Sequence, residues 1–322
     1  MLETREKGSM SKKQLISIVV PTFNEEGNIE KLFTEVQKAL KNETFEIIYI
    51  DDGSRDKSLE AVQKLAKKHS QVKFVSFSRN FGHQAALRAG LRYATGDAVI
   101  SMDADLQHPP KMLPQLLKEW RNGYDVVYTI RRDTKETSFF KRLTSWGYYG
   151  VLNFLSGLKL DEGAADFRLM DRKVVDVVNE QHESDLFLRG YINWIGFKQL
   201  GLEYVPAKRF SGTSKYSLKK MLKLAHQGIM QFSVKPLRLA LLLAMVAMVA
   251  CILYVLYAIW AAFVSDVTVP GWLSLVVLIV FLQGIQFLLI GLVGEYLGRT
   301  FIQTKQRPEF IVSNTNCEAK NS

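Results

Sequence analysis

The chain has 322 residues, of which 48% are hydrophobic and 23% are charged, and this composition excludes a disordered or low-complexity protein. Its two cysteines, Cys251 and Cys317, exclude a disulfide scaffold and a cysteine-rich zinc site. The formal net charge of +10 favours an anionic partner, such as nucleic acid, a phosphorylated substrate or a membrane surface.

The N-terminal residues are polar, and Gly8-Ser9-Met10 has the composition of an expression remnant, so we expect residues 1–14 to lie outside the fold. From residue 15 onward, β-rich runs alternate with segments whose apolar residues recur at helical spacing. This alternation predicts an α/β fold with a mostly parallel sheet, helices on both faces and ligands outside the carboxyl ends of the strands. The predicted strands are Ile16–Pro21, Phe45–Ile50, Val72–Phe77, Ala98–Met102 and Val126–Thr129, and the predicted helices are Ile29–Leu40, Ser58–His69, Gln84–Ala94, Met112–Arg121 and Asp171–Asn179.

Acidic motifs follow three of the predicted strands. They are PTFNEE at residues 21–26, DDGS at 51–54 and DADLQ at 103–107. Because parallel strands present their carboxyl ends at one edge of a sheet, we expect the three motifs to converge there and to form the active site.

The DADLQ motif is the best candidate for binding a metal ion. Asp103 and Asp105 are alternate residues after a buried strand, and Gln107 follows two positions later. Oxygen ligands at this spacing can hold Mg²⁺ or Mn²⁺ when phosphate oxygens complete the shell, and the ion then stabilises a leaving diphosphate. The alternative is a turn of solvated carboxylates. His108 is better explained as a loop residue than as a ligand.

The other two motifs have simpler alternatives. Asp51 and Asp52 can accept hydrogen bonds from a ribose or a base edge, but Asp-Gly-Ser is also an ordinary turn before a helix. Glu25 and Glu26 are also the acids that a helix dipole favours in a first turn. The absence of G-x-G-x-x-G, P-loop, H-E-x-x-H and G-x-S-x-G motifs argues against a dinucleotide oxidoreductase or a P-loop enzyme.

Basic residues gather between the predicted sheet and the apolar C-terminal part. Arg131, Arg168 and Arg209 stand beside strand ends or glycine turns, where guanidinium groups can clamp phosphates. A solvated flank is the alternative for many of the others. A nucleic-acid partner is disfavoured, because the sequence contains no known nucleic-acid module.

A basic amphipathic segment precedes the apolar part. Lys219, Lys220 and Lys223 mark its polar face, and the pattern predicts a helix lying in a membrane interface, with a helix packed inside the protein as the alternative. We place this helix at residues 217–236.

Two apolar stretches, Leu239–Ser265 and Val267–Gly294, are separated by Asp266, the only charged residue between Arg238 and Glu295. As helices they would each be about 40 Å long, enough to cross a hydrocarbon core of roughly 30 Å, and soluble core helices rarely run so long without a charge. Because basic residues flank the pair, the positive-inside rule predicts that both ends are cytoplasmic. These flanking residues are Lys235, Arg238, Arg299, Lys305 and Arg307.

Seven motifs in order are VVPTFNEE, IDDGSRD, FSRNFGHQAAL, MDADLQHPP, DFRLMDR, RFSGTSKY and GEYLGRTFIQTKQRP. On these motifs the chain, from Ile16 to Val312, resembles the family-2 (GT-A fold) polyprenyl-phosphate glycosyltransferases, most closely the bactoprenol glucosyltransferases with two C-terminal spans. Dolichol-phosphate mannose synthases are similar in the catalytic half. The Q-x-x-R-W motif of processive synthases is missing, which favours the transfer of a single sugar.

The resemblance implies a GT-A catalytic domain at 15–216, two transmembrane helices at 237–298 and a cytoplasmic tail at 299–322. It implies inverting, metal-dependent transfer of one sugar, with UDP-linked glucose preferred, to undecaprenyl phosphate at the cytoplasmic membrane face. The alternatives are N-acetylglucosamine or mannose as the sugar, a hydroxyl acceptor with Asp166 or Asp161 as the base, and a nucleotide-sugar-binding subunit without catalysis. A homotetramer is also implied, in which segments such as Thr300–Val312 pack on a neighbouring subunit.

Site residues are carried over from the same motifs. Asp103, Asp105 and Arg131 are implied as catalytic, and Asp105 with Gln107 as the ligands of Mg²⁺ or Mn²⁺. The residues implied to contact the nucleotide are Pro21, Phe23, Glu25, Asp51, Asp52 and Asp103, and those implied to bind phosphate are Arg131, Arg168, Arg209 and Lys215.

Overall fold

A computed structural model describes residues 14–132, 150, 153, 157, 161, 163–183, 186–205, 229–264 and 271–318. The chain forms two compact units. The first comprises Met1–Gly150, Leu158–Leu218 and Pro308–Ser322, and the second comprises Val151–Gly157 and Lys219–Arg307.

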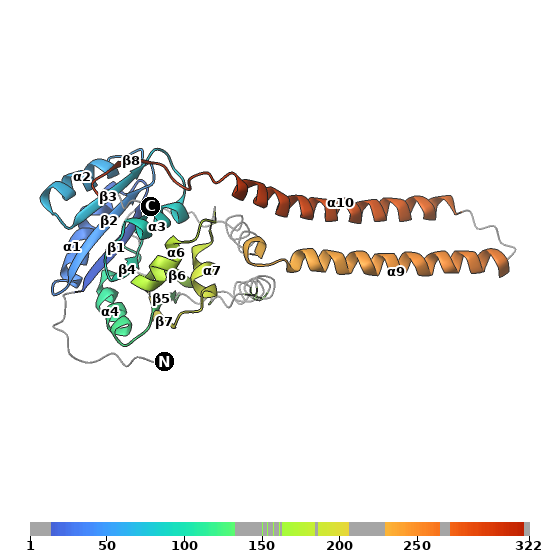
Figure 1. Cartoon of the computed structure of the whole chain (residues 1–322), viewed down its shortest axis with the longest axis horizontal. Coiled ribbons are helices and arrows are strands. Elements are labelled where there is room, and N and C mark those ends of the chain that lie inside the picture. The colour runs from blue at the N-terminus through green and yellow to red at the C-terminus, as the bar shows by residue number, and fades with distance from the viewer. Residues whose placement is uncertain are drawn as a thin grey trace. The chain divides into compact units, whose positions relative to one another are not determined.

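The first unit is built on a sheet that has eight strands among the described residues, in the order β7-β5-β6-β4-β1-β2-β3-β8 (Figure 1). Strands β1 to β4 pair in parallel, as do β5 and β7, whereas β6 is antiparallel to β4 and β5, and β8 is antiparallel to β3. The strands are β1 Leu15–Thr22, β2 Thr44–Asp51, β3 Val72–Phe77, β4 Ala98–Ser101, β5 Val126–Arg131, β6 Ala164–Asp171, β7 Gln199–Tyr204 and β8 Val312–Thr315.

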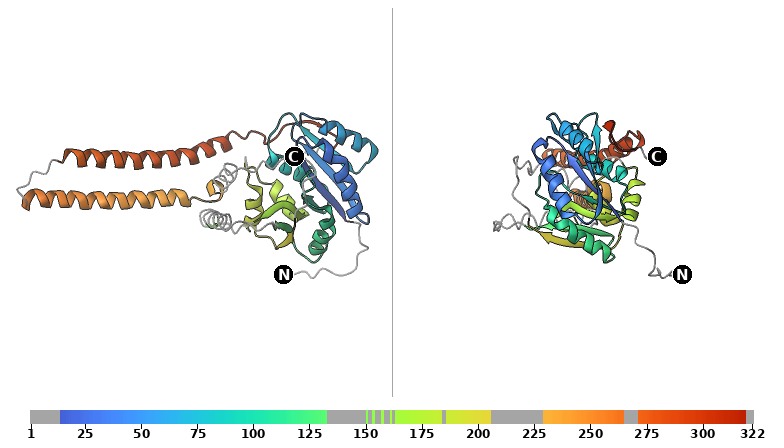
Figure 2. Two further views of the ribbon diagram at one scale, coloured as in Figure 1. Left: turned by 180° about the vertical axis from the view of Figure 1, so that it is seen from behind. Right: turned by 90° about the vertical axis from the view of Figure 1, so that its left-hand side faces the viewer.

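Helices cover both faces of this sheet (Figures 1 and 2). Helices α1 (Ile29–Ala39), α2 (Ser58–Lys68) and α4 (Leu113–Arg121) lie on one face, and α3 (His83–Tyr93) and α6 (Arg172–Asn179) lie on the other, with α7 (Leu188–Trp194) against α6. Helix α3 rests directly on β1, because a Cβ added at Gly90 would stand 2.0 Å from a methyl carbon of Val19. This contact lets α3 pack closely against β1.

The predicted α/β architecture is confirmed, and the bounds of β1–β5 and α1–α4 agree with prediction to within one or two residues. Asp171, predicted as the first residue of a helix, instead caps α6 by accepting the backbone N–H of Lys173 (3.1 Å). The sequence did not predict β6, β7, β8 or α7. Strand β6 contains the buried charges Asp166 and Arg168, which interrupt its apolar pattern, and β8 is a short edge strand without buried residues.

The second unit contains two long helices, α9 (Lys235–Val264) and α10 (Trp272–Thr304), that lie side by side (Figure 1). Both are long and apolar enough to cross a membrane. Near one end of the pair, the Tyr296 hydroxyl donates to the Ser233 carbonyl (2.8 Å). Helix α10 continues beyond Gly294, where the predicted apolar stretch ended. Of the predicted amphipathic helix, residues 217–228 lie outside the described residues.

The segment after α10 belongs to the first unit. Glu309 forms an ion pair with Arg88 of α3 (2.6 Å), and the ring of Phe310 stacks on Phe77 of β3 at 5.0 Å. In the structure, residues 309–312 of the predicted intersubunit segment Thr300–Val312 therefore lie against the sheet of their own chain.

Candidate active site

The loop after β1 is held against the loop after β2 by hydrogen bonds. The N–H of Asn24 donates to Ser54 Oγ (3.0 Å), and the N–H of Glu25 donates to Ser58 Oγ (2.8 Å). Phe23, which precedes Asn24 in the loop after β1, is 39% exposed. The first two acidic motifs are therefore adjacent, as predicted from the parallel topology, and they present an aromatic ring at the sheet edge.

Asp51 ends β2 and Asp52 follows it, and both are almost fully buried. Asp51 Oδ2 accepts the hydroxyl of Ser76 (2.8 Å), and Asp52 accepts the N–H groups of Phe81 (2.6 Å) and Gly82 (3.0 Å). Burial raises the pKa of Asp52, and the nearby charge of Asp51 adds to this effect. The N–H groups of Phe81 and Gly82 and the charge of His83 lower the pKa and offset the rise only in part. Asp51 thus binds β3 itself, and Asp52 holds the chain that follows β3.

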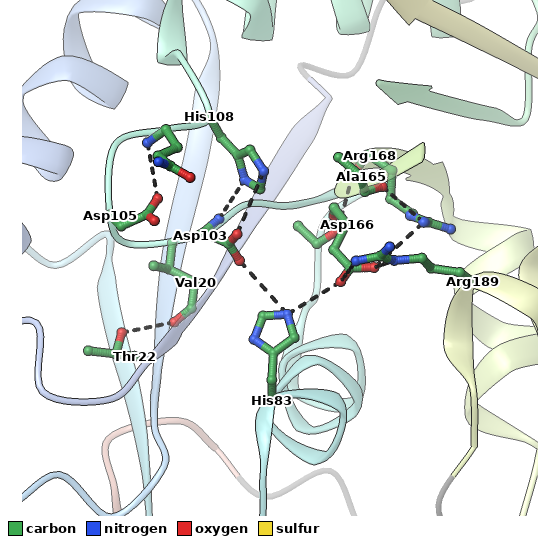
Figure 3. A network of polar contacts seen from close by, with 12 residues as sticks. Val20, Thr22, His83, Asp103, Asp105, His108, Ala165, Asp166, Arg168 and Arg189 are labelled. Atoms are coloured by element: carbon green, nitrogen blue, oxygen red, sulfur yellow. Dashed lines mark hydrogen bonds and ion pairs between the residues drawn. The ribbon is translucent and has the colours of Figure 1, made fainter. Parts of the chain in front are cut away.

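The DADLQ turn follows β4 and is held by His108 (Figure 3). The N–H of Asp103 donates to His108 Nδ1 (3.0 Å), while Asp103 Oδ2 lies 3.6 Å from His108 Nε2. The imidazole is 6% exposed and stacks on Phe167 with ring centroids 5.1 Å apart. Asp105 is 8% exposed, and its Oδ1 accepts the N–H of Gln107 (3.0 Å). His108 is thus a buried support of the turn.

A second acidic group, Asp166 of β6, lies across from this turn and is paired with cations (Figure 3). Arg189 of α7 donates from Nε to Oδ1 (2.6 Å) and from Nη2 to Oδ2 (2.7 Å). His83 Nε2 lies 3.4 Å from Asp166 Oδ2 and 3.8 Å from Asp103 Oδ1. Burial alone would raise the pKa of Asp166, but Arg189 and His83 outweigh it and hold the pKa well below its usual range.

His83 responds to the same charges in the opposite sense. Burial acts to lower its pKa, but the contact with Asp166 and the negative charges of Asp103 and Asp166 outweigh that effect, so the pKa is raised. Neither His83 nor Arg189 was predicted as a site residue. His83 lies within the FSRNFGHQAAL motif, which was the only signal for it, and the sequence carries no signal for Arg189.

The predicted phosphate-binding arginines differ in their surroundings. Arg168 is 5% exposed, donates to the Ala165 carbonyl (3.0 Å) and lies 3.6 Å from Asp166 Oδ1, and burial lowers its pKa to about 10. Arg131 is exposed at the end of β5, and its backbone N–H donates to Gly163 (2.9 Å). Arg209 and Lys215 lie outside the described residues.

Tyr204 shows that Arg131 and the DADLQ turn converge. Burial raises the pKa of the Tyr204 hydroxyl to about 12. The negative charges of Asp103 and Asp105 also raise this pKa, and the positive charge of Arg131 lowers it. The ring stands edge-on to His108, with centroids 6.1 Å apart. The ends of β4, β5 and β7 therefore face one region.

A divalent ion fits the donors of the turn. Among the described residues, no group of three or more His, Cys, Asp or Glu side chains could hold a metal ion. Asp105 and Gln107 supply a carboxylate and an amide oxygen, both suited to Mg²⁺ or Mn²⁺. Mg²⁺ commonly takes only one or two carboxylates from the protein and completes its shell with water and substrate phosphates, so a partial protein set is what such a site requires.

Comparisons with known proteins extend over nearly the whole chain. Residues 17–178 match the model "Glycosyl transferase family 2", and residues 235–300 match "GtrB C-terminal hairpin". An uncharacterized glycosyltransferase of Bacillus subtilis is 40% identical over 95% of each chain. The bactoprenol glucosyl transferase of Shigella phage SfV is also 40% identical, over 93% of this chain and 98% of its own.

A more distant similarity is found among solved structures. Glucosyl-3-phosphoglycerate synthase from Mycobacterium tuberculosis, solved with Mn²⁺, uridine-diphosphate and glucosyl-3-phosphoglycerate, is 19% identical. The match covers 70% of this chain and 84% of that one, with a TM-score of 0.46.

Proposed function

Because the chain belongs to glycosyl transferase family 2, we propose that it transfers one glucose from UDP-glucose to undecaprenyl phosphate, with inversion at the anomeric carbon. The enzyme class, glycosyltransferase, follows from the family. The choice of sugar and lipid is carried by one observation: relatives named bactoprenol glucosyl transferase are about 40% identical over more than nine-tenths of the chain, including the C-terminal hairpin.

The nucleotide is assigned to the edge formed by the loops after β1 and β2. Pro21, Phe23, Glu25 and Asp52 contact it in this proposal, with Asp51 next to them. The exposed ring of Phe23 supports the assignment, because it offers a face on which a base can stack. Asp51 and Asp52 are buried and bonded to protein donors, so their main contribution is to fix the shape of this edge.

The diphosphate is assigned to the DADLQ turn. Asp103 lies beside the ribose and diphosphate, and Asp105 with Gln107 holds Mg²⁺ or Mn²⁺. When bound, the ion neutralises charge on the departing diphosphate. The residues of the chain align the donor, and the burial of Asp105 and the contacts of Asp103 with His108 support a turn of fixed geometry.

The acceptor phosphate is assigned to Arg131, with Arg209 and Lys215. The exposure of Arg131 and its position near the DADLQ turn support this role. The sequence analysis also included Arg168 among the phosphate-binding residues. Its burial and its contact with Asp166 favour a supporting role instead, since a guanidinium in that position holds a carboxylate of the site and is closed to solvent.

The chemistry requires alignment more than proton transfer. A phosphate monoester has a second pKa near 6 and is largely a dianion at neutral pH, so its oxygen can attack the anomeric carbon as the bond to UDP breaks. A hydroxyl acceptor would need a carboxylate base. Asp166 is poorly suited to that task because its pKa is depressed by Arg189, and Asp161 accepts the hydroxyl of Tyr128. The state of these two carboxylates supports an acceptor that is already ionised.

The hairpin fits a lipid acceptor. We propose that α9 and α10 cross the cell membrane with both ends on the cytoplasmic side, where the flanking basic residues stand, and that the catalytic unit works on that side. A polyprenyl chain stays in the bilayer, so an anchored enzyme meets it there. The homotetramer remains a prediction, which light scattering of the purified protein tests.

The deciding experiment measures nucleotide release from a panel of UDP- and GDP-sugars, with and without undecaprenyl phosphate, in Mg²⁺ or Mn²⁺. We expect release that requires the lipid phosphate and is fastest with UDP-glucose, together with a product whose sugar phosphate is labile in mild acid. Release that is indifferent to the lipid contradicts the proposed acceptor. Release with a different sugar contradicts the proposed donor.

A further inference from the structure

The carboxylate of Asp103 lies between two imidazoles (Figure 3). His108 Nδ1 accepts the N–H of Asp103, which leaves the ring hydrogen of neutral His108 on Nε2, 3.6 Å from Asp103 Oδ2. His83 Nε2 approaches the other oxygen, Oδ1, at 3.8 Å. The two histidines differ in burial, since His108 is enclosed whereas the side chain of His83 is 44% exposed.

His83 alone of the two reaches a second carboxylate. Its Nε2 is 3.4 Å from Oδ2 of Asp166, the oxygen that also accepts from Arg189 Nη2 (2.7 Å). In Figure 3 the ring projects from the start of α3 into the space between Asp103 and Asp166. The imidazole therefore joins the turn assigned to the donor diphosphate to the charged pair on β6 and α7.

We propose that His83 is a positioning residue for glycosyl transfer, which orients the Asp103 carboxylate by linking it to the Asp166–Arg189 pair. This inference rests on the proposed function, because it assigns Asp103 to the donor. Attraction to both oxygens limits rotation about the side-chain bonds of Asp103. Misplacement of a reacting group by about 1 Å can cost roughly 100-fold in rate.

Helix α3, which begins with His83, is anchored by the residue before His83 and by Arg88 farther along the helix. Gly82, with φ of +101°, turns the chain into α3, and its N–H donates to the Asp52 carboxylate (3.0 Å). Farther along α3, the buried Arg88 donates to the Gln181 and Glu183 carbonyls and to Glu309. The position of the ring is thus set by the fold, which is what a positioning residue requires.

The test uses the full-length protein in detergent with UDP-glucose and undecaprenyl phosphate. The variants are His83→Ala and His83→Gln, and His182→Ala is the control because that side chain is exposed and has no part in this network. For His83→Ala we expect kcat to fall about 10- to 100-fold, with KM for UDP-glucose changed less than about 3-fold and an unchanged Tm. Glutamine presents an amide N–H near the position of Nε2, so His83→Gln restores much of kcat.

Wild-type kcat in His83→Ala, or a loss that glutamine does not restore and that follows Tm, overturns the proposal. A wild-type enzyme without lipid-dependent transfer contradicts the proposed function instead. In that case ¹⁵N-histidine spectra still test the contacts, because the chain has five histidines and His83→Gln assigns the signal. The ring signal of His83 must shift in both Asp103→Asn and Asp166→Asn. A signal that moves in neither variant overturns the proposal.

Discussion

Two buried carboxylates at the same edge of the sheet are stabilised in opposite ways. The carboxylate of Asp52 accepts the backbone N–H groups of Phe81 and Gly82, and burial raises its pKa. Asp166 is equally buried but faces Arg189, Arg168 and His83, and its pKa is held well below the usual range. The N–H donors and the charge of His83 favour the ionised form of Asp52 but do not outweigh its burial, whereas the cations around Asp166 do outweigh the burial of that carboxylate.

The contrast divides the site by purpose. The Asp52 side joins loops and shapes the edge assigned to the nucleotide, where a fixed backbone is needed. On the Asp166 side, Arg189 and His83 surround a carboxylate whose pKa they lower. A carboxylate with a lowered pKa is a weak base, which supports the proposed acceptor, a phosphate that is already ionised.

The largest effect is expected at a third carboxylate, Asp105, in the DADLQ turn. Asp105 Oδ1 accepts the N–H of Gln107 within the same turn, and we expect Asp105→Asn to fold. We expect turnover to fall at least about 100-fold, because the variant loses the anionic ligand of the metal. Steady-state assays in Mg²⁺ and Mn²⁺ measure this, with the exposed Asp176→Asn as the control. Near-normal turnover of folded Asp105→Asn contradicts the metal assignment.

The next largest effect is expected at Asp166 and tests the ion pairs around this carboxylate. Asp166→Asn leaves Arg189 and the buried Arg168 facing a neutral amide, and breaking a buried pair in this way costs about 3 kcal/mol of unfolding free energy. Asp161→Asn is the matched control, since Asp161 is exposed and is bonded to Tyr128. Thermal unfolding of the full-length variants compares them. Equal Tm values would show that the ion pairs around Asp166 add little to stability.

Two arginines of the site differ in their surroundings. Arg189 is committed to Asp166, while Arg131 is exposed at the end of β5. We expect Arg131→Ala to raise KM for undecaprenyl phosphate about 10-fold or more, because a charge-assisted hydrogen bond to phosphate is lost, with little change in donor binding. The neighbouring Arg132→Ala is the control, as Arg132 pairs with Glu203. Equal losses for donor and acceptor would show that Arg131 is wrongly assigned.

Most of the strands and helices that carry the site were predictable from the sequence, whereas the side-chain contacts between them were not. Apolar runs and helical spacing located β1 to β5 and the helices between them, and parallel topology predicted that residues after β1, β2 and β4 would meet. The hairpin was readable from length and lack of charge. These features depend on local pattern, which a single sequence displays.

The partners of Asp166 were not predictable in the same way. His83 and Arg189 come from α3 and α7, and they meet Asp166 only because β6 runs antiparallel between β4 and β5. Strand β6 itself was missed, since its buried charges break the apolar pattern that marks a buried strand. Ion pairs between distant segments leave no periodic signal, so the structure was needed to find them.

The smallest expected effect distinguishes Asp52 from Asp166 by the pH dependence of the unfolding free energy. The folded pKa of Asp52 is raised, so its ionisation in the folded state opposes stability above the unfolded value of about 3.9, and this cost is relieved as pH falls through the raised folded pKa. The folded pKa of Asp166 is lowered, so its contribution is fully present above about 3.9 and is lost only as pH falls below that value toward the folded pKa.

Unfolding free energies of wild type, Asp52→Asn and Asp166→Asn across acidic pH therefore separate the two carboxylates. We expect Asp52→Asn to cost about 1 kcal/mol at neutral pH, because an amide oxygen can keep only part of the bonding to Phe81 and Gly82. Its difference from wild type should change above pH 3.9, and that of Asp166→Asn below it. If both differences change over the same pH range, neutral donors and cations do not act differently on these two acids, and the depressed pKa that argues against Asp166 as a base loses its support.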